Sequence, residues 1–216
     1  MEIWHILNRG VEKRNIVADE KDRVRFVHDL FVFNDANIVE HISKRERRGE
    51  KSRARSLLVY IHAFCLMDNH YHFLLSEASE GGISKFMQKF NMGYTKYFNE
   101  RHQRSGALWQ GKHKKILIKR DAHFMYTPYY IHLNPLDFSM PEWRRGGVRD
   151  TKKALLHLRN YRWSSHLDYL GIKNFPSVIT RNEIGGILGS SAGYEREIVN
   201  LISGKSSAGD SLTIER

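Results

Sequence analysis

Two histidines separated by one residue, His70 and His72, lie in the largely apolar, strand-like stretch CLMDNHYHFLLSE. Side chains at i and i+2 of an extended strand point to the same face, so we expect the two imidazoles to lie side by side. Such a pair is either half of a divalent-metal site or two partly buried strand histidines bonded to their neighbours. The residues that would complete a site distinguish these interpretations.

A second stretch, YYIHLNP, supplies groups of the right chemistry. Tyr130 and Asn134 are spaced i, i+4, which places them on one face of a helix, about one turn apart. A carboxamide oxygen can complete the coordination of a hard cation, and a phenol one turn away can attack whatever the cation polarises. The spacing shows that these groups converge with the histidines if this helix packs against their strand.

The chain has ten tyrosines, so the choice of nucleophile needs an argument. Tyr94 and Tyr97 fall on an apolar helical stripe and are expected in the core. Tyr129 points about 100° away from Tyr130 on the same helix. Tyr126, one turn earlier, is the second candidate after Tyr130. Three histidines are expected to be structural: His5, His62 and His132.

The hydrophobic pattern predicts an α+β fold. The expected elements are a strand over 3–7, a helix after Asp19 or Asp22, a hairpin formed by LLVYIHAFCL and YHFLLSE, a helix over 83–101, a strand within ALWQGKHKKILI, and a helix over 121–134. The first six elements make a β-α-β-β-α-β unit, which is a ferredoxin-like antiparallel sheet with helices on one face, followed by a C-terminal helical appendage.

Pro128 lies inside the last of these helices, where a proline removes a backbone hydrogen bond. One expectation is that Thr127 caps a fresh short helix with Pro128 at its first position. The alternative is a kink that misplaces Tyr130.

The charge balance points to a polyanionic partner, because the net charge is +11 at pH 7. Nucleic acid is the commonest such partner, and no basic amphipathic helix supports a membrane surface instead. The basic stretch SKRERRGEKSRAR reads as a phosphate-binding arm or as a mobile solvated loop. A second basic stretch, RHQRSGALWQGKHKK, offers Trp109 as a base-stacking platform or as a core residue. The DNA-binding candidates are Arg45, Arg47, Arg48, Arg101, Arg104, Trp109, Lys112, Lys114 and Lys115.

A single cysteine, Cys65, excludes an internal disulfide and fits a reducing compartment. The N-terminus lacks a signal-peptide pattern, and no window has the roughly 18 uninterrupted apolar residues of a membrane span. We expect a soluble, cytoplasmic protein that associates with the nucleoid when bound to DNA.

The stretches MDNHYHFLL, GYTKYFNERHQRSGALWQGKHK, YIHLNP and YRWSSHLDYL together resemble the single-tyrosine HUH transposases, of the IS200-like family. The resemblance is to the branch of REP-associated tyrosine transposases, and it runs from about Ile3 to Leu170. HxH alone is a weak signal; HxH in a hairpin followed by YIHLNP is a strong one.

The resemblance implies a role for each matching residue. Tyr130 would be the nucleophile, and His70, His72 and Asn134 would hold Mg²⁺ or Mn²⁺. Members of this family cut and rejoin single-stranded DNA near hairpins, with a 5′-phosphotyrosine intermediate. The implied partner is single-stranded DNA with a hairpin. The resemblance leaves open whether the protein acts as a monomer or as a homodimer.

The corresponding domain division has three parts. Residues 1–170 form the catalytic domain with a basic loop at 43–56, residues 171–205 a small helical extension, and residues 206–216 a flexible tail. Two other functions stay open: a domesticated protein that binds DNA hairpins without cutting them, and an unrelated histidine metallohydrolase. The second has little support, because no HExxH motif or carboxylate cluster accompanies the histidines.

Overall fold

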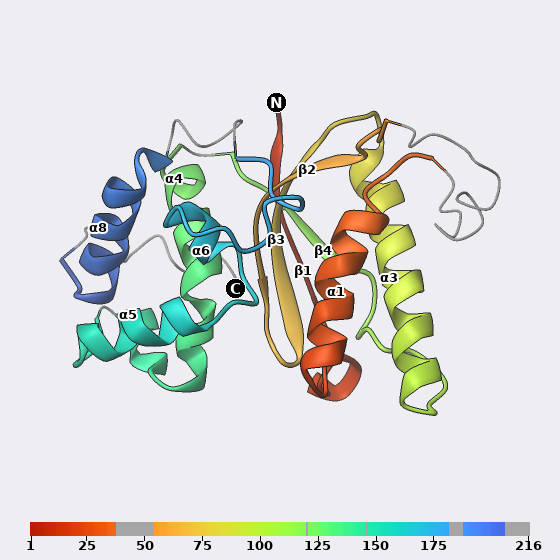
Figure 1. Cartoon of the computed structure of the whole chain (residues 1–216), viewed down its shortest axis with the longest axis horizontal. Helices are drawn as coiled ribbons and strands as arrows, with labels where there is room; N and C mark the ends of the chain where they lie inside the picture. Colours follow the sequence, from red (N-terminus) through yellow and green to blue (C-terminus); the bar gives the residue numbers. More distant parts are fainter. Residues whose placement is uncertain (38–53, 120, 146, 182–187, 206–216) are drawn as a thin grey trace.

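The computed structural model describes residues 1–37, 54–119, 121–145, 147–181 and 188–205. An antiparallel sheet with the strand order β2-β3-β1-β4 forms its centre (Figure 1). Its strands are β1 (Ile3–Arg9), β2 (Val59–Leu66), β3 (His70–Glu77) and β4 (Lys114–Leu117). The α+β class and the four-stranded antiparallel sheet are therefore confirmed.

The predicted hairpin is formed by β2 and β3, which pair with Cys65 opposite His72. On the other side of β3, β1 pairs with Leu7 opposite His72. Alternation along β3 sends Tyr71 and Phe73 into one hydrophobic cluster and Leu74 into another. The sheet thus has two buried faces.

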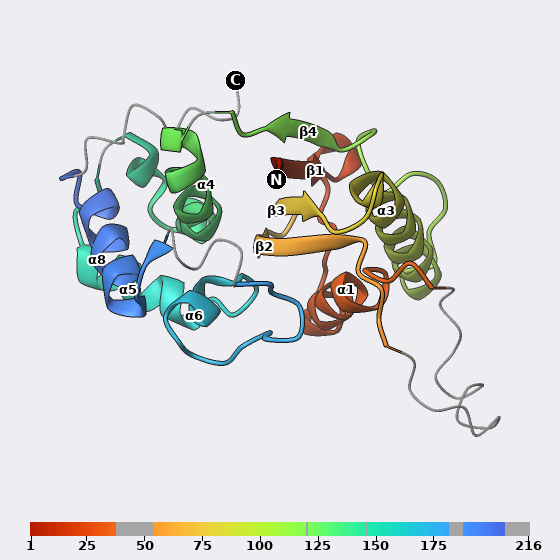
Figure 2. The same cartoon turned by 90° about the horizontal axis from the view of Figure 1, so that it is seen from above.

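The first face is covered by α1 (Glu20–Val32) and α3 (Gly82–Arg101), which lie on the same side of the sheet in Figure 2. Asp19 caps α1, because its side chain accepts from the backbone N–H of Asp22 at 3.1 Å. The turn before α3 requires glycine: Gly81 has a φ of 66°, and a Cβ on Gly82 would lie 1.9 Å from the carbonyl oxygen of Leu58. Both helices were expected from their apolar spacing.

On the second face, α4 (Asp121–Leu133) packs against β2 and β3, and α5 (Thr151–Asn160), α6 (His166–Tyr169) and α8 (Ser191–Ile202) lie on the same side of the sheet (Figures 1 and 2). Short 3-10 turns complete the described elements: η1 (Val11–Lys13), η2 (Asn134–Phe138) and η3 (Pro141–Arg145). The prediction that helices lie on one face of the sheet is therefore wrong, because helices lie on both faces. The apolar residues that β2 and β3 present on the second side also need cover, and these helices bury them.

Pro128 does not start a new helix, so the expectation of a fresh helix capped by Thr127 is wrong. The helix α4 runs from Asp121 to Leu133 with Pro128 inside it. The side chain of Thr127 is fully buried. Burial of α4 against the sheet stabilises a helix that its proline disfavours locally.

The later part of the chain holds more helix than expected. α8 lies within the predicted GYEREIVNLISG segment, and Tyr194 and Ile198 pack in the same cluster as Tyr129 and Tyr130 of α4. α5 and α6 were not predicted. The other expected C-terminal helix, the basic loop at 43–56 and the tail at 206–216 lie wholly or largely outside the described residues.

Candidate active site on the second face of the sheet

His70 and His72 point to the second face of the sheet, as the period of the strand predicts. Their ring centroids lie 5.0 Å apart and the ring planes are nearly perpendicular, at 85°. His72 is fully buried, whereas His70 is partly exposed. The two imidazoles are therefore neighbours at the edge between the core and the surface.

A third histidine, His5, completes this group from the adjacent strand β1. Its Nε2 lies 3.0 Å from Nδ1 of His72, and the two rings stack with centroids 5.2 Å apart. A hydrogen bond between two neutral imidazoles needs one donor and one acceptor, so each ring fixes the tautomer of the other. His5 was expected to be merely structural; strand alternation alone does not reveal this pairing, because the register between β1 and β3 is a long-range property.

All three imidazoles are neutral near pH 7. Burial lowers the pKa of His5 to about 4. Burial and then the neighbouring Arg9 cation lower the pKa of His70, also to about 4. Burial and the adjacent His5 and His70 hold the pKa of His72 well below its usual range. Neutral imidazole is the form that binds a metal ion.

Tyr130 lies on α4 and packs directly against this histidine group. Its ring centroid is 6.0 Å from that of His72 and 6.2 Å from that of His5, with edge-to-face geometry in both pairs. Tyr129 instead stacks on Tyr194 of α8, with centroids 5.3 Å apart. Tyr94 lies in the core of the first face, where its hydroxyl donates to the carbonyl of Ile16. Of these tyrosines, Tyr130 is the one that meets the histidines.

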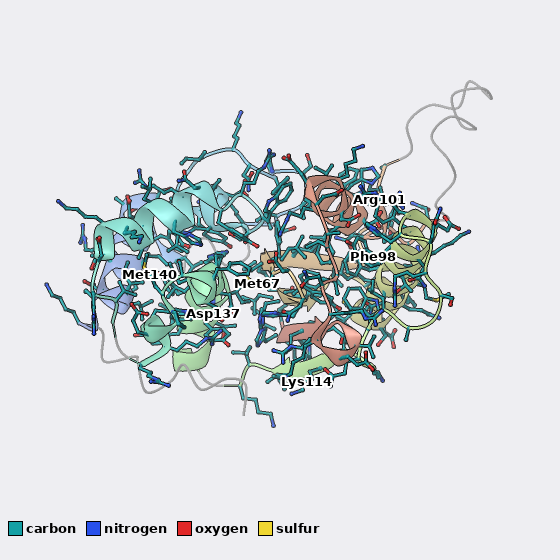
Figure 3. The ribbon with its side chains drawn as sticks, turned by 90° about the horizontal axis from the view of Figure 1, so that it is seen from below. Met67, Phe98, Arg101, Lys114, Asp137 and Met140 are labelled. Atoms are coloured by element: carbon teal, nitrogen blue, oxygen red, sulfur yellow. The ribbon has the colours of Figure 1, made fainter. Side chains whose placement is uncertain are left out.

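The hydroxyl of Tyr130 accepts a hydrogen bond from Arg144, a residue of η3 that the sequence did not single out. The Arg144 Nη1 atom lies 2.8 Å from the phenol oxygen. Asp137 holds the same guanidinium through two oxygens, at 2.8 Å from Nε and 2.6 Å from Nη2. Trp143 also donates to Asp137, at 2.7 Å. This Arg144–Asp137 pair forms the polar end of the site, and Figure 3 shows Asp137 on the α4 side of the sheet.

Asn134 follows α4 at the start of η2 and is fully buried. Its Nδ2 donates to the backbone carbonyl of Tyr130 at 2.8 Å, and its Oδ1 accepts from Nη2 of Arg144 at 2.9 Å. Tyr130 and Asn134 therefore share one face, as their spacing predicts. The carboxamide oxygen of Asn134, however, is already hydrogen-bonded to the guanidinium of Arg144.

The two histidines fit a divalent cation better than Asn134 does. The Nδ1 atom of His70 lies 2.7 Å from Oδ1 of Asn69, and that of His72 is bonded to His5, so each ring would bind a cation through Nε2. The oxygen of Asn134 would first have to leave Arg144. Within the part of the chain that the structure describes, no three His, Cys, Asp or Glu side chains gather into a metal-binding group.

A groove of about 490 Å³ opens beside His70. It is lined in part by Arg9, Lys112 and Lys114, and Figure 3 shows Lys114 on β4. The nearby Lys115 packs its ammonium 4.0 Å from the ring centroid of Trp4. Arg9, Lys112 and Lys114 thus border one groove at the end of the sheet where His70 lies.

The remaining DNA-binding candidates lie elsewhere or are engaged within the chain. Arg101 lies on the other side of the sheet from Asp137 (Figure 3), and its guanidinium binds Asp19 and the buried Asp22. Arg104 donates to Asn99 and to the carbonyl of Ala107. Arg45, Arg47 and Arg48 lie outside the described residues.

Trp109 is 9% exposed and belongs to the core of the first face. Its indole N–H donates to the carbonyl of Asn91 at 3.2 Å, and its ring meets Tyr71 edge-on with centroids 5.3 Å apart. This environment fits the core interpretation, and a base-stacking role stays a prediction.

The comparison with protein families agrees with the motifs. Residues 34–133 match the family model of IS200-like transposases, a span that contains His70, His72 and Tyr130 but ends one residue before Asn134. The resemblance to this family is confirmed. A solved structure, "Structure of the REP associates tyrosine transposase bound to a REP hairpin", aligns with a TM-score of 0.41 and 13% identity, over 64% of this chain and 68% of that chain. No curated protein matches.

None of the helices within the described ranges is long and apolar enough to cross a membrane.

Proposed function

Starting from the match of residues 34–133 to the IS200-like transposases, we propose that this protein cuts and rejoins single-stranded DNA near a hairpin, with Tyr130 as the nucleophile. The observation that carries the proposal is the packing of Tyr130 against the histidine group. The phenol comes from α4, about sixty residues after the histidines in the chain, yet the ring of Tyr130 lies 6.0 Å from that of His72. The fold therefore supports a joint role for these side chains.

A divalent cation, Mg²⁺ or Mn²⁺, would be held by His70 and His72. It would supply Lewis-acid polarisation of the scissile phosphate. Asn134 would join as a third ligand after its oxygen leaves Arg144. His5 would keep the ring of His72 in the tautomer that presents Nε2, because Nδ1 of His72 then donates to His5.

The proposed reaction exchanges one phosphoester bond for another. The phenol oxygen of Tyr130 attacks the phosphorus, a tyrosyl O–P bond forms, and the P–O3′ bond breaks. The phenol proton leaves to solvent, and the departing 3′-oxygen takes up a proton. A second DNA 3′-hydroxyl can reverse this step without ATP, because the tyrosyl phosphodiester retains the bond energy.

The site is closed over its nucleophile. Tyr130 is 0% exposed, so its oxygen reaches a phosphate only after a covering side chain moves. Arg144, with a side chain 33% exposed, bonds to that oxygen and lies nearer the solvent. We expect bound DNA to open this cover while the guanidinium of Arg144 stays bonded to Asp137.

The groove beside His70 supports a path for the DNA backbone towards the site. Arg9, Lys112 and Lys114 border it, and their side chains suit phosphate contacts that are independent of sequence. The basic loop would add further contacts.

The order β1-α1-β2-β3-α3-β4, with sheet order β2-β3-β1-β4, supports assignment of this unit to the ferredoxin-like folds. In our proposal the catalytic unit spans residues 1–170 and the helical extension spans 171–205. A homodimer and association with the nucleoid belong to the same proposal.

The alternative is a protein that binds DNA hairpins without cutting them. Two observations favour it: the full burial of Tyr130 and the bond between Asn134 and Arg144. A gel-shift and adduct assay with wild type and Tyr130→Phe separates the two functions. A cutting enzyme loses the covalent adduct in the variant and keeps hairpin binding, whereas a pure binder forms no adduct in either protein.

A further inference from the structure

We propose that Arg144 is a catalytic residue that binds the non-bridging oxygens of the phosphodiester attacked by Tyr130. This inference rests on the proposed function and adds a residue to its machinery. Arg144 lies outside the segment that matches the transposase family, so the geometry alone points to it.

The first step is the position of Arg144 relative to the reacting atom. Its Nη1 lies 2.8 Å from the phenol oxygen of Tyr130. A phosphorus about to be attacked lies about 3–3.5 Å from that oxygen. The oxygens of the phosphate therefore come within hydrogen-bonding reach of the same guanidinium.

The second step is the donor capacity of the guanidinium. It has five N–H groups in a planar fork. Four contacts use one each, to Asp137 twice, to Asn134 and to Tyr130. The other N–H on Nη1 has no acceptor among the residues that the structure describes, and the side chain is partly exposed. One donor is thus available to an anion, and the bond to the phenol can be exchanged for another.

The third step is preorganisation. Asp137 binds Arg144 through both oxygens, on the edge formed by Nε and Nη2. The guanidinium carbon also lies 4.7 Å from the ring centroid of Trp143 and 5.1 Å from that of Tyr130. A guanidinium fixed on one edge and packed against two rings keeps its Nη1 end at the phenol, so little reorganisation is needed during the reaction.

These contacts define what Arg144 does when the bonds change. As the tyrosyl O–P bond forms and the P–O3′ bond breaks, negative charge grows on the non-bridging oxygens. The guanidinium stabilises that charge by hydrogen bonds, as bidentate phosphate binding by arginine generally does. It takes no proton, because arginine stays charged at all relevant pH values.

The test compares a phosphate with a methylphosphonate at the scissile position of a hairpin oligonucleotide. A methylphosphonate lacks the charged non-bridging oxygen that Arg144 would bind. Single-turnover adduct formation is measured for wild type, Arg144→Ala and Arg145→Ala. Arg145 is the exposed neighbour in η3, so its variant controls for the loss of one positive charge.

We expect Arg144→Ala to slow adduct formation on the phosphate about 100-fold, the order found when one preorganised donor to an oxyanion is removed. On the methylphosphonate, Arg144→Ala should form the adduct less than about tenfold more slowly than wild type. Arg144 of the wild type has no charged non-bridging oxygen to bind on that substrate, so its removal costs less. Arg145→Ala should match wild type on both. Equal losses of Arg144→Ala on the two substrates, or no loss on the phosphate, overturn the proposal.

A measurement without DNA cleavage separates this inference from the proposed function. Orthovanadate, a phosphate analogue, should raise the melting temperature of wild type and Arg145→Ala but not of Arg144→Ala, because a ligand of the native state stabilises it. If wild type forms no adduct, the proposed function fails; equal vanadate stabilisation of wild type and Arg144→Ala then overturns this inference too. If Arg144→Ala does not fold, Arg144→Lys takes its place in both assays with the same expected directions, because a lysine keeps the charge but cannot bind Asp137 and the phosphate together.

Discussion

The substitution Asp137→Asn tests how firmly the Arg144–Asp137 pair is built into the site. The asparagine keeps the shape of the side chain and removes its charge. Oδ1 of Asp137 accepts from Nε of Arg144 and from Nε1 of Trp143, whereas Oδ2 accepts from Nη2 alone. An asparagine therefore keeps its oxygen at the first position and turns its own amide towards Nη2. The amide N–H of the new side chain and the Nη2 N–H of Arg144 then face each other with no acceptor between them.

The magnitude follows from the bond that is lost. A hydrogen bond to a charged group contributes about 1.5–3 kcal/mol. The Arg144 and Asp137 side chains are 33% and 28% exposed, so solvent screens the pair and lowers the expected loss of stability to about 1–2 kcal/mol. For a chain of this length that loss lowers the melting temperature by about 4 °C.

Thermal unfolding followed by circular dichroism measures this change. Glu142→Gln, an exposed acid in the same 3-10 turn, is the matched control and should melt with wild type. Adduct formation by Asp137→Asn should also fall by about tenfold, because a looser guanidinium stabilises the transition state less well. A variant that melts like wild type and Glu142→Gln would refute the reasoning about this pair.

Three further predictions concern pH, metal and the core. Burial lowers the pKa of four histidines in the folded state from the usual 6.5 to about 4: His5, His62, His70 and His166. Between these two pH values the unfolded chain binds more protons than the folded chain. The free energy of unfolding therefore falls as the pH drops from 6.5 towards 4. Each of these histidines contributes about 1.4 kcal/mol per pH unit to the slope of the unfolding free energy against pH in that window. His62→Gln should reduce this slope, measured by urea unfolding, by that amount, and an unchanged slope would contradict the prediction. Calorimetric titration with Mn²⁺ should show binding by wild type and His62→Gln but not by His70→Ala, and retained binding in His70→Ala would remove that ligand. Trp109→Phe should lower stability by about 1–3 kcal/mol and leave hairpin affinity within about twofold, because the indole is a core residue; a large loss of affinity at unchanged stability would favour base stacking.

Local patterns predicted the parts of this molecule that depend on a single element. The period of a strand placed His70 and His72 on one face, and the i, i+4 spacing placed Asn134 next to Tyr130. The cap of α1 was predicted to be Asp19 or Asp22, and the structure shows that Asp19 is the capping residue. Each of these inferences uses only neighbours along the chain.

The features that the sequence did not predict depend on contacts between distant segments of the chain. His5 meets His72 because β1 and β3 pair in a particular register, which no local pattern fixes. Arg144 meets Tyr130 because η2 and η3 turn the chain back over the end of α4, and its basic neighbours make it indistinguishable by type. Pro128 was expected to interrupt α4 because local propensity was weighed without the burial that holds the helix in place.

The most direct measurement is an adduct assay with single-stranded hairpin oligonucleotides labelled at the 5′ or the 3′ end. Wild type and Tyr130→Phe are compared with Mg²⁺, with Mn²⁺ and with a chelator. The account predicts a metal-dependent covalent adduct that carries the 3′-labelled fragment and disappears in Tyr130→Phe, because a 5′-phosphotyrosine joins the enzyme to the strand on the 3′ side of the cut. No adduct under any condition, or an adduct that survives in Tyr130→Phe, would contradict the assignment of Tyr130 as the nucleophile.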